Sequence, residues 1–428
     1  MRRAGSLTAL IACLAASLLS AGAAQAAPPP AAAVILDWNN TAVTTVRAAG
    51  AFQAEGMIYM SYTQAAVYDA VTSILGGYEQ YRTHLSAADG ALPEAAAAAA
   101  AHRVLVTYFP SQRAGLDGKY AASLAGMPPG TARDAGVTAG EHAAAAIIAL
   151  RAADGRSGTG GYSFPPAGAG VWALPTADST ATTPQTPWIR NLTPFMLQSA
   201  SQFRPEAPNA LGSSEYAEDL SEVQAFGGAA SAARTPDQTV IARFWTANII
   251  NQYNLTLRSV ATQHGMGAEA AARLLAMGNM AVGDAAIACW DAKYAYSFWR
   301  PVQAIRAGTD PTWKPLLAPT PNHPEYPSAH GCVTTAFGQA LSAALGVRKI
   351  NVDVPGINPA TGVLDPSYVR HFETAADLSR EIENSRVWGG LHFRNSVVAG
   401  VELGRDVARY DLRTNFRPVD AESDQKED

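Results

Sequence analysis

The chain has 428 residues, 48% of them hydrophobic, so it can bury a large core, and its length allows two or three domains. Its 31 basic and 36 acidic residues give a formal net charge of −5, which lacks the basic footprint that nucleic-acid binding requires. Three cysteines exclude a disulfide framework, and Cys289 and Cys332 could form one disulfide or remain two buried thiols.

Residues 1–26 have the features of a secretory signal peptide. Arg2 and Arg3 form a positive start, residues 7–19 are apolar, and an A-x-A cleavage pattern ends at Ala26. The apolar run is too short to span a bilayer, and no later stretch reaches the roughly 18 apolar residues of a membrane helix. We therefore expect a secreted or periplasmic protein without a membrane anchor. Cleavage near Ala26 would leave 29 basic and 36 acidic residues.

Most of the remaining chain predicts helices, because good helix formers dominate and apolar residues recur three or four positions apart. The predicted helices are 42–49, 57–74, 93–109, 132–153, 214–226, 237–254, 268–300, 332–345, 378–388 and 392–410. Alternating strand patterns are nearly absent. The sequence therefore predicts an all-α fold of two packed halves that resemble four-helix bundles, with few or no strands.

A long segment rich in Gly, Pro, Ser and Thr, 154–194, separates the two halves. Loops of this length are usually functional covers or disordered linkers, and the two tryptophans within it favour a packed cover. We expect an N-terminal half over 27–194, which includes this loop, and a C-terminal half over 195–419. Residues 420–428 are polar and charged and predict a disordered tail.

The first segment with unusual chemistry lies at the end of the predicted helix 268–300. Lys293 and Arg300 are seven residues apart, which places them two turns apart on one face of a continuous helix. Trp290 and further aromatic residues surround them, and Pro301 is expected to end or kink the helix. Two cations on a face crowded with aromatic residues should not simply be solvated, although surface cations that cover aromatic packing would give the same pattern.

The second segment, 323–331, leads into the predicted helix 332–345. Ser328 has the position of an N-cap, which brings a hydroxyl and free backbone N–H groups to one point and favours a bound anion. His330 follows in the first turn and could exchange protons with that anion. The alternative is an ordinary capped helix with an incidental histidine.

The third segment carries Arg386 and His392. They are six positions apart, so on one continuous helix they would point in different directions. Gly389 and Gly390 can break the helix and let both side chains reach one site. A guanidinium suits bidentate contact with a tetrahedral oxyanion, and a neutral imidazole can act as nucleophile or ligand. The alternative is a Gly-Gly turn between two helices, with the side chains of Arg386 and His392 on the surface.

Taken in order, Lys-x6-Arg-Pro, Pro-Ser-x-His and Ser-Arg-x5-His resemble the signature shared by vanadium-dependent haloperoxidases and type-2 phosphatidic acid phosphatases. The spacing matches in all three segments, and the resemblance is strongest over residues 286–400. The helical N-terminal half and residues 234–245 resemble the secreted bacterial haloperoxidase-like branch. The resemblance implies an enzyme that holds vanadate as its cofactor, in a site that phosphate can also occupy.

The resemblance also implies the residues of the oxyanion site. Lys293, Arg300 and Arg386 would bind the oxygens and neutralise their charge. The hydroxyl of Ser328 and the amide of Ala329 would add hydrogen bonds. Lys293 would in addition polarise a bound peroxide. The commonest residue of the family at the position of Ala329 is glycine, so alanine predicts an ordinary helical conformation there.

Two histidines would carry the chemistry in this resemblance. His392 would bond to vanadium in a haloperoxidase or attack phosphorus in a phosphatase, and His330 would be the acid–base partner on the opposite side. Trp290 resembles the tryptophan that borders the cofactor of haloperoxidases. His323 stands where bromoperoxidases carry histidine and chloroperoxidases carry phenylalanine, although a loop histidine without a catalytic part is the alternative.

We therefore interpret the chain as a vanadate-dependent haloperoxidase-like enzyme that oxidises halide, bromide in preference to chloride, with hydrogen peroxide. Its partners would be small molecules: peroxide, halide, and an organic acceptor or phosphate ester. The first alternative is an acid phosphatase that forms a phosphohistidine and is inhibited by vanadate. The second is a phosphate-binding protein without catalytic activity.

Overall fold

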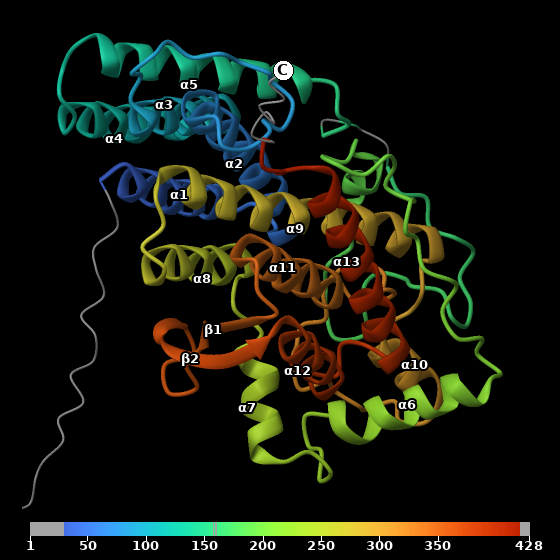
Figure 1. Ribbon diagram of the computed structural model, residues 1–428. Coiled ribbons are helices and arrows are strands. Elements are labelled where there is room, and N and C mark those ends of the chain that lie inside the picture. Colours follow the sequence, from blue (N-terminus) through green and yellow to red (C-terminus); the bar gives the residue numbers. More distant parts are fainter. Residues whose placement is uncertain (1–29, 157, 159–160, 420–428) are drawn as a thin grey trace, which may run out of the picture.

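The computed structural model describes residues 30–156, 158 and 161–419, and in these residues the chain folds into thirteen α-helices and one two-stranded sheet (Figure 1). The fold is all-helical in class, which confirms the prediction from sequence. None of the helices within the described ranges is both long and apolar enough to cross a membrane. The predicted signal peptide and the predicted tail 420–428 lie outside the described residues.

The N-terminal helices pack closely because their contact faces carry small residues. They are α1 Pro30–Ala48, α2 Gln53–Leu75, α3 Pro93–Tyr108, α4 Arg113–Ala125 and α5 Thr131–Leu150. The alanines of α3 from Ala95 to Ala101 are fully buried between α2 and α5. On α5, a Cβ at Gly136 or Gly140 would collide with backbone carbonyl oxygens on or next to α3. Small side chains on both helices therefore allow this close approach.

The second part of the chain supplies the remaining elements. They are α6 Ser214–Gly227, α7 Pro236–Phe244, α8 Ile249–Gln263, α9 Ala268–Tyr296, α10 Pro301–Gly308, α11 Ala329–Leu345, β1 Lys349–Ile357, β2 Leu364–Thr374, α12 Ala375–Trp388 and α13 Arg394–Thr414. The two strands pair antiparallel, with Val352 opposite Phe372. Both of these side chains are buried, and the sheet packs beside α8 and α12.

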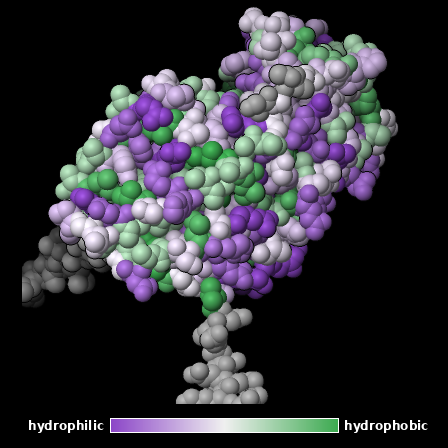
Figure 2. Space-filling view, turned by 90° about the horizontal axis from the view of Figure 1, so that it is seen from above, coloured by the Kyte–Doolittle hydropathy of each residue, from purple (hydrophilic) through white to green (hydrophobic). Residues whose placement is uncertain are grey.

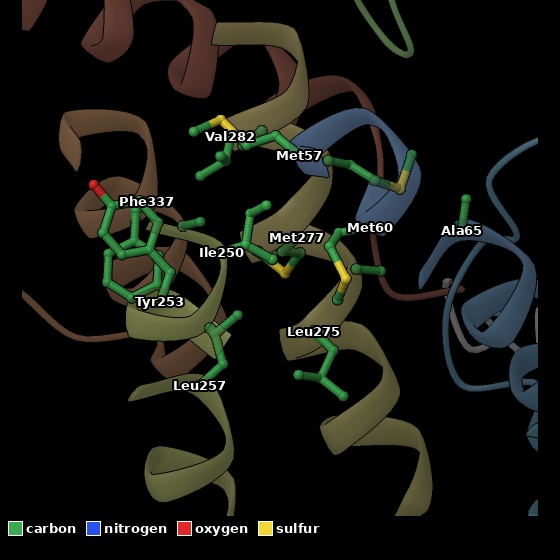
Figure 3. Close-up of a cluster of buried hydrophobic side chains, with 14 of the residues drawn as sticks. Met57, Met60, Ala65, Ile250, Tyr253, Leu257, Leu275, Met277, Val282 and Phe337 are labelled. Atoms are coloured by element: carbon green, nitrogen blue, oxygen red, sulfur yellow. The ribbon is translucent and has the colours of Figure 1, made fainter. Parts of the chain in front are cut away.

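Helix α9 joins the two parts, because it packs against α2 on one side and against α11 and α13 on the other. Its side chains are buried almost throughout, and one continuous hydrophobic core includes residues of both parts. Figure 3 shows a section of this core, in which Met60 of α2 and Met277 of α9 lie near Ile250 of α8. On the face seen from above, hydrophobic and hydrophilic residues are mixed (Figure 2).

The long segment 154–194 packs against the rest of the protein. Trp172 is fully buried, and its backbone N–H donates to the carbonyl oxygen of Ser297 at 2.8 Å. Where the segment returns, the backbone N–H of Thr193 donates to the carbonyl oxygen of Asp154 at 2.8 Å. The segment therefore closes over the C-terminal end of α9, where the first motif lies.

Two predicted helices differ from the structure in a way that affects the site. The predicted helix 237–254 is two helices, because Asn248 leaves the helical conformation and its side chain accepts from the N–H of Asn251 at the start of α8. The predicted helix 268–300 ends at Tyr296, since Ser297 has a positive φ of 49°. The helices α4 and α10 and the two strands were not predicted individually.

Candidate active site

The three motif segments meet at one cavity of about 80 Å³. Six of the residues that the sequence predicted for the site line this cavity, and they are Trp290, His323, Ala329, His330, Arg386 and His392. The remaining wall comes from Pro321, which lies two residues before the second motif, and from five residues far away in sequence, which are Phe52, Gln53, Ala54, Met57 and Ile249. The cavity therefore lies between the C-terminal motifs and the start of α2.

Lys293 and Arg300 do not share a helical face, contrary to the expectation from their spacing. Lys293 lies in the last turn of α9, whereas Arg300 is the N-cap residue of α10 and Pro301 is its first residue. Proline is favoured at this position because its missing N–H would have no partner there. Pro301 thus starts a helix here, and the turn at Ser297 redirects Arg300 toward the cavity residues.

The ammonium group of Lys293 is fully buried and holds the loop that precedes α11. It donates to the carbonyl oxygens of Pro324 at 3.0 Å, Glu325 at 2.9 Å and Pro327. Burial lowers the pKa of Lys293 to about 8. Lys293 does not line the cavity, and its three contacts make it the support of the loop behind the cavity wall.

The guanidinium of Arg300 connects two of the motifs. Nε and Nη2 donate to the carbonyl oxygen of His323 at 3.1 and 3.0 Å, and Nη1 donates to that of Leu391 at 3.0 Å. The same Nη1 lies 3.3 Å from Nε2 of His392. Burial lowers the pKa of Arg300. Arg300 therefore places a positive charge directly beside the imidazole of the third motif.

Glu325, which had no role in the analysis of the sequence, orients His392. Its side chain is fully buried, and Oε1 accepts from Nδ1 of His392 at 2.8 Å and from the N–H of Phe393 at 3.0 Å. A proton on Nδ1 leaves Nε2 as a free electron pair. Burial raises the pKa of Glu325 to about 7. In the sequence, the only sign of this role of Glu325 is its position two residues after His323 in the second motif.

His392 stands in the bend between α12 and α13. Gly390 has a positive φ of 75° and lies against the backbone of Gly227, so this bend depends on the missing side chain. Burial, followed by the nearby charges of Arg300 and Lys293, lowers the pKa of His392 well below its usual value. The imidazole is therefore neutral, and its Nε2 can act as ligand or nucleophile.

Ser328 and His330 lie at the start of α11. Ser328 is the N-cap residue of α11 by position, yet its side chain makes no capping hydrogen bond. The expectation that its hydroxyl caps the helix is therefore wrong. Within the described residues, its buried Oγ and the buried Nε2 of His330 have no hydrogen-bond partner. Ala329 begins the helix in the ordinary helical conformation. Burial and the charge of Arg386 lower the pKa of His330 well below its usual value.

Arg386 is the cation that lines the cavity. Its Nη1 donates to the carbonyl oxygen of Trp245 at 3.4 Å, while its buried Nε has no partner in the described part of the chain. Burial lowers its pKa. The site thus has three buried cations, Lys293, Arg300 and Arg386, and one buried carboxylate, Glu325. Buried charges require compensation, so this arrangement favours a bound anion.

An aromatic cluster forms another part of the cavity wall. The ring of His323 lies 5.2 Å from that of Trp290 and 6.2 Å from that of Phe52, measured between centroids. Nδ1 of His323 is 3.0 Å from Nη2 of Arg300. Burial and then Arg300 lower the pKa of His323 well below its usual value. His323 is therefore a buried residue of the cavity wall.

The two cysteines lie behind the cavity as free, fully buried thiols. Sγ of Cys289 is 3.7 Å from the carbonyl oxygen of Pro327, and Sγ of Cys332 is 3.2 Å from that of Ser328. Neither sulfur lines the cavity. The structure thus shows the second of the two arrangements that the sequence allowed.

Comparison with known proteins gives consistent results. Residues 273–420 match the family model of the second helical-bundle domain of vanadium chloroperoxidase. A stretch of 258 residues, 46% of the chain, is 27% identical to the vanadium chloroperoxidase of Curvularia inaequalis. The aligned stretch covers 42% of that relative, which is less than half of its length.

Solved structures share the fold. A bacterial vanadium-dependent iodoperoxidase superposes with a TM-score of 0.77 at 20% identity, covering 92% of this chain and 98% of its own. The holo form of a bacterial vanadium-dependent chloroperoxidase superposes with a TM-score of 0.64 at 18% identity, covering 83% and 90%. The likeness to these structures therefore extends through both halves of the chain.

Proposed function

We propose that this chain, which belongs to the vanadium-dependent haloperoxidase superfamily, oxidises halide ions with hydrogen peroxide at the cavity beside His392. The observation that carries the proposal is the position of His392 Nε2, 3.3 Å from Nη1 of Arg300 in a buried and cationic site. Ser328 Oγ, His330 Nε2 and Arg386 Nε, which have no hydrogen-bond partner among the described residues, provide further groups for the oxygens of an oxyanion.

These groups fit vanadate. His392 would bond to the vanadium through Nε2, and Arg300 and Arg386 would hold the oxygens by charge-assisted hydrogen bonds. Ser328 would donate its hydroxyl, and the N–H of Ala329 opens the helix where anions bind. Vanadate, when bound, supplies a Lewis acid that activates hydrogen peroxide toward halide without a change in its oxidation state.

The protein itself orients groups and moves protons. Glu325 keeps the proton of His392 on Nδ1, so that Nε2 stays available. His330 would accept the proton of incoming peroxide and return it to the leaving oxygen, because it lines the cavity and its Nε2 has no partner within the described part of the chain. Lys293 would stabilise the charge on the bound anion from behind the loop, and direct contact would require it to release one carbonyl oxygen.

The aromatic wall supports bromide in preference to chloride. Bromide is more easily oxidised and less strongly hydrated than chloride, so the rings of Trp290, Phe52 and His323 suit it better. The cavity of about 80 Å³ is well below the roughly 300–1,000 Å³ of sites for larger organic ligands. We infer that the oxidised halogen leaves the site and reacts with an organic acceptor in solution.

A phosphatase is the second candidate, because a histidine oriented by a carboxylate is also a good nucleophile toward phosphorus. The small cavity disfavours it, since the alcohol part of a phosphate ester must fit as well. A purified protein assayed in parallel separates the two. We expect bromination that requires vanadate. Ester hydrolysis that vanadate inhibits, without bromination, would establish the phosphatase, and tight phosphate binding with neither activity would indicate a non-catalytic protein.

We also propose that the protein is exported and cleaved near Ala26. The supporting observation is the arrangement of Arg2, Arg3, the apolar run 7–19 and the A-x-A pattern. The N-terminal mass of the protein recovered from the medium or periplasm tests this proposal, and a full-length protein retained in the cytoplasm would contradict it.

A further inference from the structure

We propose that Met57 is a self-oxidation site, whose thioether the enzyme's own hypohalous product converts to the sulfoxide during turnover. This inference rests on the proposed function, because that reaction supplies the oxidant. Met57 belongs to α2 and is 5% exposed, and it lines the same cavity as His330 and His392. No other residue of that cavity wall contains sulfur.

The geometry gives the product an immediate target. A cavity of about 80 Å³ places every wall residue near any molecule formed inside it. Confinement of two reactants at such distances corresponds to effective concentrations of millimolar or more, well above the concentration of product that has diffused into solution. The wall residues Phe52, Ala54 and Ile249 react with hypohalous acids far less readily than a thioether, whereas the indole of Trp290 and the imidazoles of the wall also react and are the competing targets.

The reaction balances with groups that the proposed function provides. The sulfur lone pair attacks the halogen of hypobromous acid and releases hydroxide, which gives a bromosulfonium ion. Water then adds to sulfur, and bromide and the protons leave. The sulfur is oxidised by two electrons, the halogen is reduced to bromide, and the net products are methionine sulfoxide and hydrogen bromide. Bromide returns to the cycle.

Sulfoxide formation would disturb the site. It converts a flexible apolar side chain into a polar one with an S=O acceptor. In this wall the new oxygen would lie among Phe52, Ile249 and Arg386, which line the same cavity. A polar acceptor there would compete for Arg386, so we expect activity to fall as Met57 becomes oxidised.

The chain contains its own control, Met266. It is partly exposed, whereas the other methionines of the described residues are buried. Met266 precedes the start of α9, and Trp290 lies near the end of that helix. At 1.5 Å per residue these two positions are separated by about 35 Å along α9. An oxidant that arrives from solution therefore meets Met266 first, and one made in the cavity meets Met57 first.

The experiment uses the full protein loaded with vanadate. Bromide and limiting hydrogen peroxide are added, bromination of a reporter is followed, and peptide mass spectrometry measures sulfoxide at Met57 and Met266. We expect Met57 to be oxidised at least about tenfold faster than Met266. Reagent hypobromous acid added to protein without vanadate should reverse the order. Peroxide and vanadate without bromide should oxidise neither residue.

Each result decides a separate point. Bromination with Met266 oxidised first, or with both oxidised equally, would overturn the inference and leave the proposed function intact. Absence of bromination would overturn the proposed function, and with it the source of the oxidant. The conservative variant Met57→Leu adds a second measurement. Its rate, normalised to its own initial value, should decline at least threefold more slowly, and a decline equal to that of the unchanged protein would contradict the inference.

Discussion

Replacement of Glu325 by glutamine tests how the buried carboxylate acts on His392. Oε1 of Glu325 accepts from His392 Nδ1 at 2.8 Å and from the N–H of Phe393 at 3.0 Å. Oε2 has no partner within the described residues. A glutamine side chain has the same shape and can keep its oxygen in both hydrogen bonds, with its NH₂ group in the place of Oε2. The substitution therefore removes the charge and preserves the geometry.

Two opposing effects determine the size of the change. A hydrogen bond to a charged group contributes about 1.5–3 kcal/mol and a neutral one about 0.5–1.5 kcal/mol, so His392 becomes a weaker ligand by about 1.4 kcal/mol. Loss of the charge also removes repulsion of a bound anion. For unit charges about 7 Å apart at an effective dielectric of about 20, this repulsion is about 2 kcal/mol. The second effect acts on vanadate and phosphate alike and cancels in the ratio of their affinities.

The assay measures dissociation constants of vanadate and phosphate by calorimetry, at a pH above about 7 where Glu325 is charged and both anions carry comparable charge. For Glu325→Gln we expect the ratio of vanadate to phosphate affinity to fall about tenfold. The control Glu373→Gln makes the same change on the exposed surface of β2 and should leave the ratio unaltered. If Glu325→Gln also leaves the ratio unaltered, the carboxylate does not act on the bond between His392 and vanadium, and the reasoning is refuted.

Three further predictions concern other parts of the molecule. His392→Ala should lose both vanadate affinity and turnover, whereas His330→Ala should bind vanadate comparably and turn over about 10²–10⁴-fold more slowly; the reverse pattern would exchange the two roles. Burial raises the pKa of Asp411 well above its usual value, so folding takes up a proton and stability falls as the pH rises above about 4. Asp411→Asn should therefore raise the Tm at pH 8 by about 2 °C and leave it unchanged at pH 4, and an equal shift at both pH values would contradict the argument. In Gly404→Ala the new Cβ would collide with the carbonyl oxygen of Cys332, and we expect denaturant unfolding to show a loss of about 2 kcal/mol or more, with wild-type stability as the contrary outcome.

The sequence alone determined the elements that depend on local interactions. Apolar residues three or four positions apart predicted the helical class, because helix periodicity is a property of neighbouring residues. The three motifs likewise carried their chemistry in residue types and spacing. The sequence also indicated a break at Gly389 and Gly390, and the structure shows a bend there with a positive φ at Gly390.

Tertiary structure decided everything that depends on residues distant in the chain. The spacing of Lys293 and Arg300 suggested one helical face, yet α9 ends before Arg300, and the two cations instead bind carbonyl oxygens of a loop that follows them. Glu325 gains a role only because the bend before α13 brings His392 to it. Met57 reaches the cavity from a helix more than 200 residues earlier in the chain, because α2 packs against α9. Contacts of this kind leave no periodic signal, since packing selects them for shape and charge after the helices have formed.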